Sequence, residues 1–129
     1  MILVDTSCWI EVLRERGDAA VCRRMNDLVR SGQACWSPVV RLELWNGARG
    51  IREKKALREF EQVLPELEMP AEVWEIACEL ARNARTAGQT IPATDLLIAA
   101  CARHHGVGIE STDAHFTEPY PCNRSADLR

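Results

Sequence analysis

The chain has 129 residues, a formal net charge of −3 and 47% hydrophobic residues, the size and composition of one globular domain. Its longest uncharged apolar run near the C-terminal half, residues 96–102, is far shorter than the roughly 20 residues of a membrane span, and no basic, apolar signal sequence opens the chain. We therefore expect a single domain over residues 1–129, a cytoplasmic location and no membrane partner.

Cysteine usage and charge exclude two further classes. The six cysteines form no C-x-x-C pair, so we expect reduced thiols in the core rather than a zinc site or a disulfide framework. The net charge lacks the strong basic excess of many nucleic-acid-binding domains. All but two of the 16 basic residues are arginine, however, and the planar guanidinium suits phosphates and carboxylates alike.

The first 45 residues alternate strand and helix patterns. Residues 2–4 are uniformly apolar and predict a short strand buried on both faces. Asp18 and Gly32 bracket an amphipathic helix. Residues 33–36 predict a second strand, after which Ser37 and Pro38 predict the N-cap and first position of another helix.

The remainder continues this rhythm. Residues 51–64 predict a helix with Leu57, Phe60, Val63 and Leu64 along one side. The alternating segment 66–70 predicts an edge strand, and residues 70–88 predict a long helix. A further helix is predicted over 91–106, with Thr94 as N-cap, then an inner strand over 107–112 and a short last strand near 120–123. The pattern is that of the α/β class, with a parallel sheet of about five strands flanked by helices.

Most of the acidic residues fall on the polar faces of predicted helices, but four do not. Asp5 ends the first strand, Glu43 lies between two leucines, Asp95 opens an uncharged helical segment, and Asp113 follows the last inner strand. Because strand ends and the helix starts that follow them share one edge of a parallel sheet, we expect these side chains to converge, with Glu43 reaching the cleft from the second βα unit.

Four carboxylates in a small cleft repel one another unless several are protonated or a divalent cation is bound. Oxygen ligands without nearby cysteine or histidine favour Mg²⁺ or Mn²⁺, which can activate water for attack on a phosphodiester. A simpler interpretation stays open for each acid: Asp5, Thr6 or Ser7 as a helix cap, Asp95 as a helix-dipole acid, and Glu43 as half of an ion pair with an arginine.

Four short motifs carry a resemblance to a known family. The segments "ILVDTS", "RLELWNG", "TDLLIAACA" and "IESTDAHF" resemble, in order and spacing, those of the PIN domain, and in particular of the VapC type of toxin from toxin–antitoxin pairs. The resemblance implies a single PIN-like domain with a five-stranded parallel sheet, although the last strand is poorly formed in "YPCNRSADLR". It also implies a Mg²⁺- or Mn²⁺-dependent endoribonuclease.

The resemblance assigns roles residue by residue. Asp5, Glu43, Asp95 and Asp113 correspond to the catalytic, metal-binding acids, and Thr6 and Ser111 to auxiliary hydroxyl residues. Gly47, four residues after Glu43, also matches, and a glycine there allows a backbone or ligand to approach closely. The implied partners are an RNA substrate, a VapB-type antitoxin and a second copy of the chain. The alternative is a non-catalytic PIN-fold module that binds RNA or protein.

Overall fold

The computed structural model describes residues 1–112, which form three strands and six helices. Asp113, the expected last strand near 120–123 and Cys122 lie outside the described residues. The elements, in chain order, are β1 (Ile2–Val4), α1 (Thr6–Leu13), α2 (Ala19–Arg30), β2 (Ala34–Cys35), α3 (Pro38–Gly47), α4 (Gly50–Val63), α5 (Ala71–Thr86), α6 (Ala93–His105) and β3 (Gly108–Glu110).

The sheet is parallel, as the uniformly apolar strands predict, with the order β2-β1-β3. In the central strand β1, Leu3 and Val4 are fully buried. The register pairs Ile2 with Ala34 on one side and Val4 with Glu110 on the other. This register fixes which residues meet beyond the strand ends: Asp5, next after Val4, lies beside Ser111, next after Glu110.

The predicted edge strand at 66–70 is reduced to a single bridge. Glu66 pairs in parallel with Trp36, whose backbone N–H donates to Pro65 O at 3.1 Å and whose carbonyl accepts from Leu67 N at 2.9 Å. The prediction of a full strand was wrong, because β2 is too short to offer more than one further partner and the prolines at 65 and 70 supply no backbone donor. The position beside β2, at the sheet edge, agrees with the prediction.

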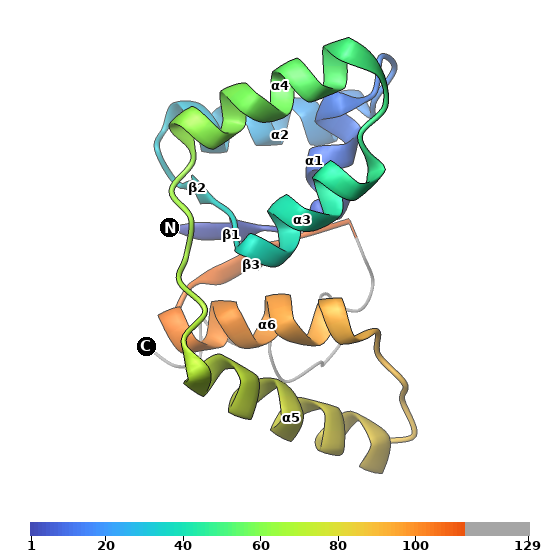
Figure 1. The fold of residues 1–129 in the computed structure, drawn as a ribbon, viewed down its shortest axis with the longest axis vertical. Coiled ribbons are helices and arrows are strands. Elements are labelled where there is room, and N and C mark those ends of the chain that lie inside the picture. The colour runs from blue at the N-terminus through green and yellow to red at the C-terminus, as the bar shows by residue number, and fades with distance from the viewer. Residues whose placement is uncertain (113–129) are drawn as a thin grey trace.

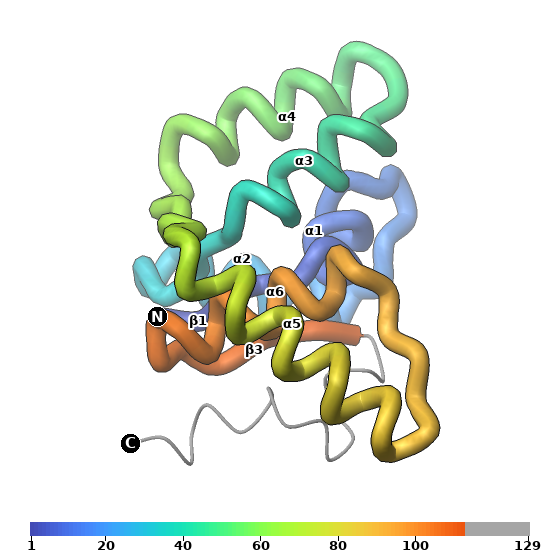
Figure 2. The backbone as a smooth tube through the Cα atoms, turned by 60° about the horizontal axis from the view of Figure 1, so that its bottom comes forward, coloured from blue at the N-terminus to red at the C-terminus, as the bar shows by residue number. Residues whose placement is uncertain are grey.

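The helices lie on both sides of this small sheet. Figure 1 shows α5 and α6 as an antiparallel pair below the strands, with α3 and α4 above them. The turned view of Figure 2 shows α3 directly beside α4, away from α5. Contacts of α3 with α1, α4 and α6 make it the helix that links the two halves.

Aromatic side chains hold α1 against β2 and α4. Trp9 and Trp36 are fully buried and meet edge to face, with ring centroids 6.1 Å apart, and Trp9 also packs against Phe60 at 5.1 Å. The indole N–H of Trp9 donates to Val4 O at 3.2 Å, so this large side chain is buried without losing its polar partner. The contact fixes α1 relative to the end of β1.

Most of the predicted helix boundaries are confirmed. Asp18 caps α2 by accepting from Val21 N at 2.9 Å, and Ser37 caps α3 with Pro38 at the first position. The predicted N-cap Thr94 is wrong: α6 begins at Ala93, and its cap position is Pro92, two residues earlier than predicted. Gly106 ends that helix in the left-handed region at φ 66°, where glycine carries no steric penalty.

One predicted packing position is also wrong. The helical period places Val63 beside Leu57 and Phe60, but its side chain is 65% exposed, whereas Leu57 is fully buried. Val63 is the last residue of α4, and the chain leaves the helix at Leu64, which is the residue that turns into the core. The helical period therefore fails to predict the buried face at the last residue of the helix.

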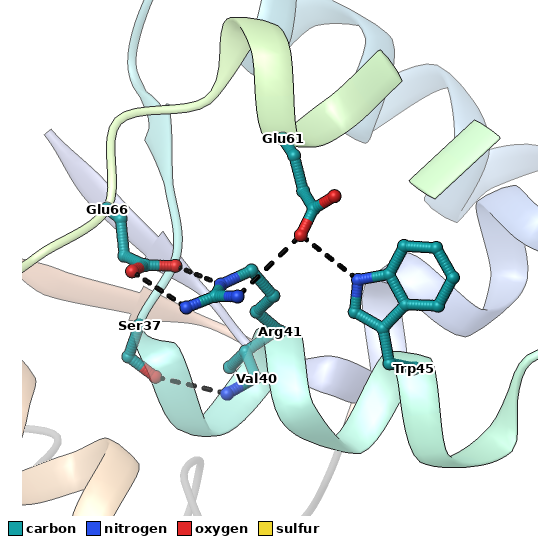
Figure 3. Close-up of polar contacts among 6 residues, drawn as sticks. All are labelled: Ser37, Val40, Arg41, Trp45, Glu61 and Glu66. Carbon is teal, nitrogen blue, oxygen red and sulfur yellow. Dashed lines mark hydrogen bonds and ion pairs between the residues drawn. The ribbon is translucent and has the colours of Figure 1, made fainter. Parts of the chain in front are cut away.

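Charged side chains outside the core attach α3 to its surroundings (Figure 3). The Arg41 guanidinium contacts both Glu66, at 2.6 Å, and Glu61, at 3.7 Å, and Glu61 also accepts from the Trp45 indole N–H at 3.1 Å. Hydrogen bonding to Glu66 raises the pKa of Arg41 above its ordinary value. These contacts join one face of α3 to α4 and to the segment after it.

The predicted core position of the cysteines is confirmed for three of the five described ones, but Cys78 is exposed and Cys22 is half-buried. Cys8, Cys35 and Cys101 are buried and unbridged, and burial raises the pKa of each thiol to about 11. Such thiols act as small apolar core groups. None of the helices within residues 1–112 has the length and apolar character needed to cross a membrane.

The cap of α3 gives a test of the fold. Ser37 is fully buried, and its Oγ accepts from Val40 N at 3.2 Å (Figure 3). We predict that Ser37→Ala lowers the free energy of unfolding by about 1–2 kcal/mol, because the buried N–H loses its acceptor. Urea denaturation measures the change, and Ser37→Thr, which keeps the hydroxyl, is the matched control. Equal stability of Ser37→Ala and wild type would contradict the assigned cap.

Candidate active site

Asp5 lies at the carboxyl end of the central strand and is 4% exposed. Its side chain caps α1 by accepting from Ser7 N at 3.3 Å. The same oxygen, Oδ2, accepts from Ser7 Oγ at 2.8 Å and from Ser111 Oγ at 3.0 Å. Three donors thus hold one oxygen, while Oδ1 takes part in none of these three bonds.

Ser7 connects this carboxylate to the end of the third strand. Its hydroxyl lies 3.2 Å from that of Ser111 and accepts from Thr112 N at 3.1 Å. The backbone N–H of Asp5 also donates to Glu110 O at 2.9 Å. The segment that leads into Asp113 is therefore attached to the start of α1 through both backbone and hydroxyl groups.

Glu43 reaches this region from the second turn of α3. Its Oε1 accepts from Thr6 Oγ1 at 2.7 Å, and the side chain of Thr94 lies near enough to lower its pKa. Burial raises the pKa of Glu43, and the negative charges of Asp5 and Asp95 raise it further, against the opposing effect of the two threonines. This pKa shift links the three acids electrostatically.

Asp95 lies in the first turn of α6 and is half-buried. An acid in this position is favoured by the positive end of the helix dipole. Asp5, Glu43 and Asp95 therefore come from the end of β1, from α3 and from the start of α6, and they lie close enough to interact electrostatically, as their positions predict. Asp5 is buried, whereas Glu43 and Asp95 are half-buried. The fourth predicted acid, Asp113, lies outside the described residues.

The structure supports one part of the simpler interpretation of these acids and contradicts another. Asp5 does cap α1, and Asp95 does stand at a helix start. Within residues 1–112, however, neither Asp5 nor Glu43 forms an ion pair with an arginine or lysine. The cap role and a ligand role of Asp5 are compatible, because the cap bonds all use Oδ2.

The donor set fits a hard divalent cation in its chemistry. It consists of carboxylate and hydroxyl oxygens, the ligands that Mg²⁺ and Mn²⁺ prefer, and Mg²⁺ needs only one or two carboxylates besides water. Across the described part of the chain, no group of three or more His, Cys, Asp or Glu side chains is arranged to hold an ion by itself. The fit therefore rests on the crowding of three acids and on the donor type.

A pocket of about 410 Å³ opens from Glu43 along α1 and α3. Its walls include the apolar side chains Ile10, Leu13 and Leu44 together with Arg14 and Arg49. Gly47, which matched the family pattern, lines it too, and a Cβ added there meets nothing within 4 Å. The glycine thus borders open space rather than a close backbone contact.

Two residues of the site were missed by the sequence analysis. The sequence indicates Ser7 only as a cap, although its hydroxyl contacts Asp5, Ser111 and the Thr112 backbone. Thr94 has the pattern of a cap, but its side chain instead acts on Glu43, whose pKa it lowers. The available signal was their position: each stands within two residues of a predicted acid, at the same edge of the sheet.

Known proteins share the sequence pattern and the fold of this chain. The sequence matches the PIN domain family over residues 2–120. It is 34% identical over 120 residues to VapC ribonuclease Mb1587 of Mycobacterium bovis and to ribonuclease VapC11 of Mycobacterium tuberculosis, which covers 90% of this chain and 89% of each relative.

Solved structures with the same fold include VapBC2 from Rickettsia felis, bound to a DNA fragment from their promoter, with a TM-score of 0.76 and 16% identity over 95% of both chains. FitAcB from Neisseria gonorrhoeae matches with a TM-score of 0.68 and 24% identity, over 98% of this chain and 94% of that one. The family match, the identity to VapC ribonucleases and the shared fold together show that this chain belongs to the PIN-domain family.

Proposed function

We propose that this chain is a metal-dependent endoribonuclease and the toxin of a VapBC-type toxin–antitoxin pair. The observation that carries the proposal is the convergence of Asp5, Glu43 and Asp95 without an ion pair to Asp5 or Glu43 from within residues 1–112. The relatives named VapC ribonuclease, which match over most of both chains, support the class of reaction.

Asp5, Glu43, Asp95 and Asp113 would hold Mg²⁺ or Mn²⁺. When bound, such an ion supplies an acidified water and compensates the charge on the phosphoryl oxygens during phosphodiester hydrolysis. The chain's own hydroxyl groups position the acids, because Ser7 and Ser111 orient Asp5 and Thr6 orients Glu43. Since these donors are neutral, they fix the carboxylates without cancelling their charge.

The alternative function is a non-catalytic PIN-fold module that binds RNA or protein. Such a module has no need of acids that repel one another in the same place, and crowding of this kind costs stability. The two functions differ in a direct assay: incubation of the purified protein with total RNA and Mg²⁺ or Mn²⁺, beside an Asp95→Asn control. Cleavage by the wild type alone would support the nuclease.

Metal removal is the first test of the mechanism. We predict that EDTA abolishes RNA cleavage and that added Mg²⁺ or Mn²⁺ restores it, because the three acids need a cation to act together. Gel analysis of a labelled RNA gives the rate, and Zn²⁺-saturated EDTA controls for nonspecific effects of the chelator. Cleavage that continues unchanged in EDTA would exclude this mechanism.

Asp5→Asn separates the ligand role from the cap role. Asparagine caps helices about as well as aspartate and its carbonyl can accept from Ser7 and Ser111, so the fold should be kept. We predict a loss of cleavage of at least about 100-fold. Without metal at low salt, the melting temperature should rise by about 2–6 °C, because relief of repulsion outweighs the weaker hydrogen bonds.

Thermal melts with EDTA and with Mg²⁺, together with the cleavage assay, distinguish the outcomes. Metal should raise the melting temperature of the wild type more than that of Asp5→Asn, since binding to the folded state stabilises it. Full activity with an unchanged melting temperature would mean that Asp5 is only a cap. A strongly destabilised variant would mean that its charge is needed for the fold.

The proposed partner is a VapB-type antitoxin, which would insert a basic segment into the acidic cleft, where arginine–carboxylate pairs form bidentate contacts. We predict that the product of an adjacent gene copurifies with this chain and blocks its toxicity on coexpression. Pull-down and growth assays check this, and light scattering tests the homodimer that the family resemblance implies. If the neighbouring gene product neither binds nor protects, the toxin assignment is wrong.

A further inference from the structure

The pocket beside Glu43 combines features that the acid cluster lacks. Ile10, Leu13 and Leu44 give it an apolar wall, and its volume of about 410 Å³ lies within the ordinary range for ligand pockets, about 300–1,000 Å³. Glu43 forms part of the lining, so the pocket is continuous with the acid cluster. A group bound there would therefore lie next to the proposed site of cleavage.

Of the two arginines that line this pocket, Arg49 is the one whose side chain has no ion pair within residues 1–112. Its backbone N–H donates to Glu53 Oε1 at 3.0 Å, but its exposed guanidinium makes no hydrogen bond or ion pair with any residue in 1–112. Arg14, also in the lining, pairs with Glu11 at 2.9 Å. Arg52 donates to Leu13 O at 2.7 Å and thereby fixes the wall rather than facing a ligand.

The acid cluster by itself repels a polyanion, so a ribonuclease needs cations nearby to bring RNA to it. An arginine side chain with five unused donors suits a phosphate, and apolar walls suit the face of a base. The absence of a side chain at Gly47 keeps the pocket open on the side of α3. The two arginines of the lining offset its two acids, Glu43 and Glu53, so the pocket lacks the negative charge of the acid cluster. Its mixed polar and apolar lining and its position beside the acids favour a nucleotide over an apolar ligand.

We propose that this pocket is a nucleotide subsite for single-stranded RNA, in which Arg49 contacts a phosphate and the apolar wall receives the base next to the cleaved bond. The subsite rests on the proposed ribonuclease function and adds a determinant of substrate affinity to it. It would make cleavage depend on the nucleotide that flanks the scissile phosphate.

Two variants test the subsite by different routes. Arg49→Ala removes the cation, and Gly47→Leu places a side chain in the open space without a positive φ to forbid it. The matched controls are Arg30→Ala and Ala71→Leu, the latter adding a leucine at the exposed first position of α5, outside the pocket lining. Arg30 is exposed in the last turn of α2, just before β2, and so lies at the opposite edge of the sheet. Melting temperatures confirm that all four variants fold.

The measurements are kcat and KM on a short RNA that the wild type cleaves, and fluorescence anisotropy of the same RNA, labelled, on an Asp95→Asn background. We expect Arg49→Ala and Gly47→Leu to weaken binding and raise KM by about tenfold while kcat changes little. Arg49→Ala should also reduce the slope of log K against log salt by about 1, as for the loss of one phosphate contact. Both controls should behave as wild type.

The two hypotheses fail in distinguishable ways. If the wild type cleaves no RNA with either metal, the proposed function is wrong and the subsite falls with it. If the wild type cleaves RNA but Arg49→Ala and Gly47→Leu bind and cleave as it does, the subsite alone is wrong. Unchanged RNA binding with lost binding of the antitoxin would likewise overturn the subsite and make the pocket a protein-docking site.

Discussion

The carboxylate of Asp5 is the point on which the arrangement of the site depends. Its Oδ2 accepts hydrogen bonds from the start of α1 and from the residue after β3, and Asp5 itself directly follows the central strand. The parallel register that pairs Val4 with Glu110 makes this possible, because it brings Asp5 and Ser111 side by side. One buried acid thus joins a strand end, a helix start and the segment that leads to Asp113.

The choice of partners for the acids explains how a negative site persists in a folded protein. Asp5 and Glu43 are held by serine and threonine hydroxyls, which satisfy buried carboxylate oxygens at little cost to their charge. An arginine in the same place would stabilise the fold more but would compete with a cation. The raised pKa of Glu43, caused by burial and then by Asp5 and Asp95, records the electrostatic strain that remains.

Much of this arrangement could be predicted because local signals and topology agree. The apolar run at residues 2–4, the caps Asp18 and Ser37, and the strand at 107–112 each specify an element, and a parallel sheet then requires Asp5, Glu43 and Asp95 to meet. The errors arose where a local pattern competes with tertiary structure. Thr94 is a residue type that often caps helices, yet its side chain interacts with Glu43. Residues 66–70 alternate between polar and apolar like a strand, but β2 beside them is too short to pair with more than one of them.

The side-chain contacts across the site could not be predicted from the periodicity of the sequence. The contact between Ser7 and Ser111 joins residues 104 positions apart, and it depends on the register of two strands rather than on either sequence alone. The pocket has the same origin, because Arg14 follows α1 whereas Gly47 and Arg49 flank the end of α3. Only the packing of those two helices brings them together.

The geometry of α3 connects the two parts of the site. Ser37 starts the helix beside β2, Glu43 then enters the acid cluster in the second turn, and Gly47 ends the helix at the pocket one turn later. A rise of about 1.5 Å per residue places the Cα atoms of Glu43 and Gly47 roughly 6 Å apart along the helix axis. This short helix, which the ion pairs of Arg41 with Glu61 and Glu66 anchor, therefore sets the positions of both Glu43 and the α3 side of the pocket.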